Sequence, residues 1–365
     1  MKILTVVGAR PNFIKAAPLH RAFRQYPTIE SKIVHTGQHY DARMSAIFFR
    51  ELDLPEPDYT LGISTGTQVQ QLAEIMLRFE DVLTAEQPDW VLVVGDVTST
   101  LACALVANKM GVRVAHVEAG LRSGDRKMPE EINRILTDSI ADLLFVTEQA
   151  GLDNLKREGI ADEKVRFVGN VMIDSLAYSR MKANEQNTVG QLGLLPGGYV
   201  VMTMHRPGNV DTEAGLTNLV AIVERVARDK TVLFPVHPRT RSNLVRYGLL
   251  GCLTMIPNVR LLEPQGYLAF LNLLEHAAIV ITDSGGVQEE TTYLRVPCLT
   301  LRQSTERPVT VELGTNQLLA KLDPDSVRER VTDILTCGAK QSLTPPLWDG
   351  NAATRIAAAL LETRS

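Results

Sequence analysis

The sequence predicts an α/β protein of two doubly wound, Rossmann-like domains, each a parallel sheet with helices on both faces. Three observations predict this fold. Short runs rich in β-branched residues alternate with helix-like stretches through the first half of the chain. Those runs are almost continuously apolar, which is typical of parallel strands buried on both faces. The alternation restarts at Gly198, and 365 residues correspond to about two domains of roughly 150 residues each.

The first half of the chain contains strand candidates separated by amphipathic stretches. The strands are expected at Lys2–Val7, Ser31–His35, Trp90–Val94, Arg113–Val117 and Leu143–Thr147. Helices are expected at Val69–Leu83 and Leu101–Met110, where apolar residues recur at helical spacing. Because ligands bind outside the carboxyl ends of strands in such sheets, the residues after each strand are candidate site residues.

The second half repeats the pattern after a predicted linker. Residues 169–198 carry Asn, Pro and Gly residues that indicate a linker with a turn near residue 196. The strands that follow are expected at Gly198–Met204, Thr231–Val236, Val259–Leu262, Ile279–Thr282 and Pro297–Leu301, and a final helix at Ala352–Thr363. We therefore expect one domain of residues 1–168 plus 351–365, a second of residues 169–350, and a site in the cleft between them.

Composition excludes several classes of function. The chain has 38 basic and 42 acidic residues, a net charge of −4, and a pI near 6.0, so it has no bulk attraction to nucleic acid. No run approaches the roughly 18 apolar residues of a spanning helix, and the apolar start ends at Gly8, too early for a signal peptide. The four cysteines lack a C-x-x-C spacing. We expect a cytoplasmic protein with no membrane insertion and no nucleic-acid partner.

Basic residues follow the first strand. In Gly8-Ala9-Arg10-Pro11, a turn leads into a helix start, and Arg10 and Lys15 lie where a helix N-terminus binds anions. The stretch lacks both G-x-G-x-x-G and the P-loop pattern. A structural turn with solvated basic residues is the alternative interpretation.

Acidic residues follow two later strands. Asp96 follows the strand that ends at Val94, and Glu118 follows the strand that ends at Val117. Carboxylates at the ends of two buried strands should face the same site, and Arg122 lies near them. Glu130 and Glu131 come just after Pro129 at a helix start, where one of the two is expected to be only a partner of the helix dipole.

In the second half, Ser284-Gly285-Gly286 follows a strand and opens a helix. Free amides at that helix start, with the Ser284 hydroxyl, are suited to bind a diphosphate. Glu290, further along the helix, is suited to accept hydrogen bonds from ribose hydroxyls. A plain tight turn with Ser284 as the N-cap is the alternative. His205 and His237 also stand at strand ends.

A metal site is not expected. His35 and His39 have the i, i+4 spacing of metal ligands only if they are helical, and Gly37 favours a turn. We expect neither a metal nor a cofactor.

Seven motifs in register resemble the non-hydrolysing UDP-N-acetylglucosamine 2-epimerases over essentially the whole chain. They are Gly8-Ala9-Arg10-Pro11, Thr36-Gly37-Gln38-His39, Gly95 to Thr100, His116 to Arg122, Pro129 to Arg134, Thr282 to Glu290 and Thr305-Glu306-Arg307-Pro308. The resemblance implies a GT-B type architecture, with the active site between two Rossmann-like domains.

The resemblance also implies roles for individual residues. For binding of the UDP-sugar it implies Arg10, Phe270, Ser284, Gly285, Gly286, Glu290 and Arg307, to which we add Lys15 and Arg122 as candidates. For catalysis it implies Asp96, Glu118, Glu130 and His205. Phe270 is implied by the resemblance alone, because its local sequence is typical of a core residue.

Two departures concern regulation and substrate. Many bacterial members bind an activating substrate molecule through a Gln-His-x-Gln element and an Arg-Gln pair, whereas this chain has only a remnant in Gln38, His39 and Gln68. His35 to Tyr40, with Met44-Ser45, resembles a branch that acts on UDP-2,3-diacetamido-glucuronic acid, while Glu306-Arg307-Pro308 resembles the N-acetylglucosamine branch.

The activity implied is reversible C2 epimerisation of UDP-N-acetylglucosamine to UDP-N-acetylmannosamine, by elimination and re-addition of UDP. A homodimer that serves cell-surface polysaccharide synthesis is expected. The alternatives are the same chemistry on the diacetamido-glucuronate, a hydrolysing 2-epimerase, a GT-B glycosyltransferase, and a sugar-nucleotide sensor without catalysis.

Overall fold

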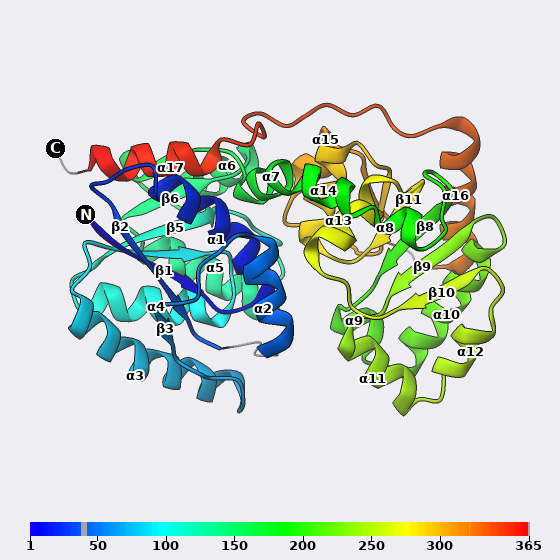
Figure 1. The fold of residues 1–365 in the computed structure, drawn as a ribbon, viewed down its shortest axis with the longest axis horizontal. Helices are drawn as coiled ribbons and strands as arrows, with labels where there is room; N and C mark the ends of the chain where they lie inside the picture. Colours follow the sequence, from blue (N-terminus) through cyan, green and yellow to red (C-terminus); the bar gives the residue numbers. More distant parts are fainter. Residues whose placement is uncertain (38–41, 321, 364–365) are drawn as a thin grey trace. The chain divides into compact units, whose positions relative to one another are not determined.

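The chain forms two compact units, each built on a parallel sheet (Figure 1). The computed structural model describes residues 1–37, 42–320 and 322–363. One unit comprises Met1–Tyr178 with Pro346–Ser365, and the other comprises Ser179–Pro345. Helices alternate with strands in both, so the predicted α/β class with two parallel sheets is confirmed.

Among the described residues, the first unit has a seven-stranded sheet in the order β3-β2-β1-β4-β5-β6-β7. Its strands are β1 (Lys2–Val7), β2 (Glu30–His35), β3 (Tyr59–Thr60), β4 (Trp90–Val94), β5 (Arg113–Ala119), β6 (Leu143–Val146) and β7 (Val165–Phe167). Neighbouring strands pair in parallel. The sequence missed β3 and β7 because two or three residues at a sheet edge are too few to show a period.

Helices of the first unit cover both faces of its sheet. They are α1 (Arg10–Phe23), α2 (Ala42–Glu51), α3 (Gln68–Glu86), α4 (Thr98–Lys109), α5 (Pro129–Ile140), α6 (Gln149–Arg157), the 3-10 helix η1 (Asp162–Lys164), the start of α7 (Val171–Gln186), and α17 (Ala352–Glu362). One apolar cluster lies between the sheet and α3 and α4, and a second includes residues of α1 and α17. Figure 1 shows α17 beside α1 and α3 beside α4, and both pairs are in contact.

The segment at residues 169–198, predicted as a linker, is helical for most of its length, and the boundary between the two units falls within it. The segment contains α7 and the short helix α8 (Thr188–Gln191), and α7 buries Ile173 and Leu176. Asn170 and Asn187, two of the residues that indicate a linker, both cap helices. Asn170 Oδ1 accepts from the Met172 amide at 2.9 Å, and Asn187 Oδ1 accepts from the Gly190 amide at 3.1 Å.

Within the described part of the second unit, a six-stranded sheet has the order β10-β9-β8-β11-β12-β13. Its strands are β8 (Tyr199–Thr203), β9 (Thr231–Pro235), β10 (Val259–Leu262), β11 (Ile279–Thr282), β12 (Cys298–Thr300) and β13 (Asn316–Leu318). Its helices after α8 are α9 (Pro207–Val210), α10 (Glu213–Ala227), α11 (Pro238–Arg246), α12 (Leu250–Met255), α13 (Tyr267–Glu275), α14 (Gly285–Leu294), α15 (Pro308–Glu312) and α16 (Pro324–Cys337). Apolar clusters lie on both faces of this sheet. No helix in the described parts of either unit combines the length and apolar character needed to cross a membrane.

A buried carboxylate ties α3 to the edge of the first sheet. Glu86 accepts hydrogen bonds from Lys32 Nζ at 2.8 Å and Lys2 Nζ at 3.1 Å, and from the Tyr59 hydroxyl. Its side chain is only 7% exposed. The Lys32 and Tyr59 hydrogen bonds lower the pKa of Glu86 to about 2, although burial opposes them.

This lowered pKa predicts how stability depends on pH. A carboxylate whose pKa is lower in the folded state stabilises the fold above its unfolded pKa, and the stabilisation is lost as pH falls toward the folded pKa. Glu86→Gln should therefore lower the melting temperature at pH 7, and the difference from wild type should shrink between pH 4.5 and pH 3. Thermal unfolding monitored by circular dichroism measures this. Glu74→Gln, which removes a carboxylate from an exposed pair with Arg78, is the control. A melting-temperature difference between Glu86→Gln and wild type that stays constant with pH would contradict the assignment.

Candidate functional site

The start of α1 is fastened to the ends of two neighbouring strands. Asn12 Oδ1 accepts from the amides of Gly8 at 3.1 Å and Ala9 at 3.0 Å, and Asn12 Nδ2 donates to the Val94 carbonyl at 2.9 Å. The loops after β1 and β4 are thereby held together at one edge of the sheet. The backbone of Arg10 begins α1, but its side chain lies outside the described part of the structure.

Lys15 and Glu118 form a buried ion pair at this edge. The Lys15 ammonium contacts Glu118 Oε2, and both side chains are at most 8% exposed. Gly95 lies against the pair, since a Cβ there would stand 3.2 Å from Lys15 Nζ and 3.4 Å from Glu118 Oε2. The sequence predicts an anion site at Lys15 and a catalytic role for Glu118, but it does not indicate that the two side chains are ion-pair partners.

Glu118 has an unusual backbone. Its φ is +75°, in the left-handed region, and the β5–β6 register shifts between Val117 and Ala119. For a residue other than glycine this conformation costs about 1–3 kcal/mol, and it persists only where the surroundings impose it. Such bulges re-aim side chains beside active sites. The bulge therefore sets the direction of the Glu118 carboxylate.

Asp96 is the more accessible of the two strand-end acids. Its side chain is 28% exposed and pairs with Arg134 Nη1, while its carbonyl accepts from Asn133 Nδ2 at 2.8 Å. Arg134 is buried and also contacts Glu131 Oε2 at 2.7 Å. Consecutive residues of α5 thus fix both the backbone and the carboxylate of Asp96.

The adjacent residues Glu130 and Glu131 have different environments. Glu131 is buried and accepts from the amides of Ser123 and Gly124, each at 2.9 Å. Burial raises the pKa of Glu131, but these amides and Arg134 outweigh it and keep that pKa below its ordinary value. Glu130 is partly exposed. Glu131 is therefore the structural member of the pair, and Glu130 remains available to a ligand.

Arg122 is held by acidic partners in the first unit. Its Nη2 lies 2.6 Å from Glu158 Oε2 and 2.8 Å from Asp138 Oδ2, and its Nη1 donates to the Leu121 carbonyl at 2.8 Å. The Arg122 side chain is 10% exposed. These contacts fix the position of the Arg122 guanidinium.

In the second unit, a buried aspartate organises the end of β8. Asp283 accepts from the amides of His205 at 3.1 Å and Arg206 at 2.9 Å, and from Asn209 Nδ2 at 3.0 Å. Asp283 Oδ1 is also 3.0 Å from His205 Nδ1. Burial raises the pKa of Asp283, but hydrogen bonds from His205 and its neighbours hold it below the ordinary value. The imidazole of His205 is 37% exposed and lies 5.3 Å from that of His237.

The Ser-Gly-Gly turn opens α14 as the sequence predicts. Ser284 occupies the N-cap position but makes no side-chain capping hydrogen bond to the helix, and its amide donates to Thr282 Oγ1 at 3.0 Å. A Cβ at Gly285 would stand 2.5 Å from Arg307 Nη1. Gly285, which Gly286 follows in the helix, is therefore what lets the Arg307 guanidinium lie against the helix start.

Arg307 belongs to a buried cluster of charges. Its Nη1 contacts Glu306 Oε1 at 2.7 Å, and its Nε lies 2.8 Å from Glu289 Oε1. Glu306 also pairs with Arg302 at 2.8 Å and Arg206 at 3.4 Å. Burial raises the pKa of Glu306, but these arginines hold it far below its ordinary value. Guanidinium groups and the first amides of α14 together favour an anion.

The other predicted residues lie in varied surroundings. Glu290 is buried on α14, and Phe270 packs, partly exposed, against the apolar cluster that includes Leu273 and Val287. Gln68 is exposed at the start of α3. Gln38 and His39 lie outside the described residues.

No metal centre is found among the described residues. His35 is buried against Phe13 and Phe49, and burial lowers its pKa, as expected for a neutral core histidine. Within the ranges that the structure describes, no group of three or more His, Cys, Asp or Glu side chains is arranged to hold a metal ion.

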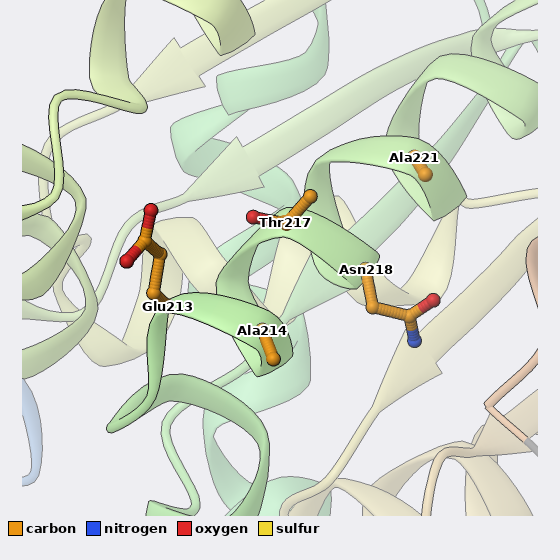
Figure 2. Close-up of a pocket in the computed structure, with 5 residues that line it drawn as sticks. All are labelled: Glu213, Ala214, Thr217, Asn218 and Ala221. Atoms are coloured by element: carbon orange, nitrogen blue, oxygen red, sulfur yellow. The ribbon is translucent and has the colours of Figure 1, made fainter.

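The surface depression in Figure 2 does not coincide with this chemistry. It is lined by one helix, α10, through Glu213, Ala214, Thr217, Asn218 and Ala221. Asn218 donates to the Leu322 carbonyl. None of these five residues follows a strand of the sheet, so the polar groups at the strand ends are the better candidate site.

Known proteins match the chain over nearly its full length. Residues 21–361 match the family model described as UDP-N-acetylglucosamine 2-epimerase. A UDP-N-acetylglucosamine 2-epimerase of Methanococcus maripaludis is 40% identical over 97% of both chains. A UDP-2,3-diacetamido-2,3-dideoxy-D-glucuronate 2-epimerase of Pseudomonas aeruginosa is 41% identical over 98% of both. The crystal structure of Methanocaldococcus jannaschii UDP-GlcNAc 2-epimerase with UDP-GlcNAc and UDP has a TM-score of 0.92 at 42% identity, covering 99% of this chain and 100% of that one.

The contrast between Glu130 and Glu131 predicts different effects on stability. Glu131→Ala should destabilise the fold by about 2 kcal/mol or more, because it leaves the Ser123 and Gly124 amides and buried Arg134 short of an acceptor. Glu130→Ala should change stability by less than about 0.5 kcal/mol, as is usual for a surface position. Urea unfolding of both variants measures this, and equal losses would contradict the assignment.

Proposed function

This chain belongs to the UDP-N-acetylglucosamine 2-epimerase family, and from that premise we propose that it interconverts UDP-N-acetylglucosamine and UDP-N-acetylmannosamine. The observation that carries the proposal is the pairing of two chemistries in one chain. Carboxylates stand at the strand ends of the first unit, and the Arg307 guanidinium stands beside a glycine-rich helix start in the second. A reaction that expels a diphosphate from a sugar needs both.

The chemistry explains why these groups are needed. The C2 proton of an N-acetylhexosamine is not α to a carbonyl, so removing it directly is very hard. If UDP leaves C1 first, positive charge at C1 acidifies the C2 proton, and its loss gives a 2-acetamidoglucal. Protonation of C2 from the other face and return of UDP to C1 invert the centre. The scheme needs cations at the leaving group and acid–base groups at the sugar.

We assign the carboxylates to the sugar. Asp96 acts as the base at C2, since it is the more accessible strand-end acid. Glu118 and Glu130 serve as the proton partner and the stabiliser of positive charge on the ring. Lys15 acts through its ion pair with Glu118. The ammonium group keeps the Glu118 carboxylate ionised, so that its negative charge lies next to the ring. No cofactor is required, because every step is a proton transfer or the breaking or forming of the C1–O bond.

We assign the second unit, with Arg10 of the first, to UDP. Arg10, His205 and Arg307 stabilise the leaving diphosphate, together with the Ser284 hydroxyl and the Gly285 and Gly286 amides. Glu290 accepts from the ribose hydroxyls, and Phe270 lies beside the uracil. Arg122 remains a candidate for substrate contact, and Asp138 and Glu158 orient its guanidinium.

One alternative substrate has specific support. The Pseudomonas aeruginosa relative is named for UDP-2,3-diacetamido-2,3-dideoxy-D-glucuronate and is as similar to this chain as the relative named for UDP-N-acetylglucosamine. The elimination scheme is the same for both sugars, so the second candidate differs only in groups at C3 and C5.

We also propose a cytoplasmic homodimer that supplies a UDP-sugar for cell-surface polysaccharides. The family resemblance supports this part of the proposal.

Incubation of the purified protein with UDP-N-acetylglucosamine alone tests the proposed activity. We expect proton NMR to show a mixture of two UDP-linked epimers. Free N-acetylmannosamine with UDP would instead indicate a hydrolysing enzyme, and an unchanged substrate would indicate a glycosyltransferase or a sensor. A parallel incubation with the diacetamido-glucuronate identifies the preferred substrate.

The role assigned to Glu130 predicts a loss of activity when its carboxylate is replaced. Glu130→Gln should lower kcat by about 100- to 10,000-fold, the usual contribution of an acid–base group, without weakening UDP binding by calorimetry. A Glu130→Gln enzyme with wild-type kcat would contradict its assigned role.

A further inference from the structure

His116 links the two acidic loops of the first unit. It lies on β5, fully buried, two residues before Glu118. Its Nδ1 is 2.6 Å from Asp138 Oδ1 and its Nε2 is 2.8 Å from the Gly95 carbonyl. Both partners are acceptors, so both ring nitrogens must carry hydrogen for the two hydrogen bonds to form.

Asp138 forms hydrogen bonds to the chain on both sides of Glu118. Its Oδ1 binds His116, and its Oδ2 accepts from the Gly120 amide at 3.0 Å and lies 2.8 Å from Arg122 Nη2. His116 and Gly120 are each two residues from Glu118, whose φ of +75° is the strained point of the strand. One buried carboxylate therefore holds both ends of the bulge.

The other nitrogen of His116 reaches the second acidic loop. Gly95 directly precedes Asp96 and has a φ of +71°. Its carbonyl is bound by His116, and its amide donates to the Val117 carbonyl at 3.0 Å. The backbone that leads into Asp96 is thereby fixed to β5, and through His116 to the same Asp138.

Resting on the proposed function, we propose that His116 and Asp138 are a positioning pair that sets Asp96 and Glu118 in their catalytic geometry. Neither residue needs to touch the substrate. Their effect passes through the Gly95 carbonyl to Asp96, and through the ends of the bulge to Glu118.

The cost of burying the pair supports a positioning role over a purely packing one. Apolar side chains of similar volume usually fill a buried site with equal or better stability than an ion pair. Here the hydrogen bonds of His116 and Asp138 go to the backbone at Gly95 and beside Glu118, two residues with left-handed φ, and not to side chains of the surrounding core. A misplacement of catalytic groups by about 1 Å can lower the rate by about 100-fold.

Four substitutions separate the contacts. His116→Gln can keep a donor toward the Gly95 carbonyl but loses Asp138, while His116→Asn can keep a donor toward Asp138 but loses Gly95. Asp138→Asn can keep every hydrogen bond, since its amide nitrogen can donate to His116 Nδ1 while its oxygen accepts from Gly120 and Arg122. Asp138→Ala loses them all.

A control comes from the other end of β5. Asp142 Oδ2 accepts from the Val114 amide at 2.8 Å, so Asp142→Ala also removes a carboxylate that anchors β5, but away from Asp96 and Glu118. Each variant is assayed for kcat and KM with UDP-N-acetylglucosamine, for UDP affinity by calorimetry, and for melting temperature.

We expect Asp138→Ala, His116→Gln and His116→Asn each to lower kcat by about 10- to 100-fold, with KM and UDP affinity within about threefold of wild type. Asp138→Asn should retain kcat within about fivefold. Asp142→Ala should lower the melting temperature without changing kcat. Wild-type kcat in both His116 variants, or kcat losses that merely follow the folded fraction in every variant, would overturn the proposal, as would equal losses in Asp138→Asn and Asp138→Ala.

Failure of the proposed activity is recognised separately. A wild-type protein that produces no epimer refutes that activity, and the positioning pair is then tested by NMR of ¹⁵N-histidine-labelled protein. The pair predicts two protonated ring nitrogens for His116 in the wild type and one in Asp138→Asn. In the wild type, protonation of Nδ1 alone would overturn the link to Gly95, and protonation of Nε2 alone would overturn the donation to Asp138.

Discussion

A buried carboxylate is stable only when donors surround it, and this requirement determines how the loops at the strand ends are held. Asp138 and Glu131 in the first unit, and Asp283 and Glu306 in the second, are all buried, and each accepts from several groups. Their donors lie on strands, on the loops that follow those strands, or on neighbouring helices. Each acid therefore joins segments that the sheet alone would leave independent.

In each unit, acids that hold the loops lie next to groups assigned to the reaction. Glu131 fixes the 123–124 loop while Glu130 beside it stays partly exposed. Asp283 holds the amide and the ring of His205, whose imidazole stays accessible. Because each structural acid is adjacent in sequence or in space to a reactive group, the fold can place reactive groups accurately while leaving them available.

Sequence reasoning found the sheets and the strand-end acids because both depend on local patterns. Asp96 and Glu118 were identified because each follows an apolar run. It missed β3, β7 and β13, which are two or three residues long, and α7, whose capping Asn170 resembles a loop residue. It also missed Asp138, Arg134 and Asp283 as organisers. Asp283 had a signal, an acid directly after a buried strand, but the roles of Asp138 and Arg134 on α5 arise only from packing.

The central claim is that the carboxylates of the first unit exchange the C2 proton of a sugar whose UDP has departed. Running the reaction in deuterium oxide tests this most directly, with the isotope at C2 followed by NMR and mass spectrometry in both epimers. The account predicts one deuterium at C2 of the UDP-N-acetylmannosamine formed, and growing exchange in the recovered substrate. Retention of the original C2 hydrogen in the product would contradict the account.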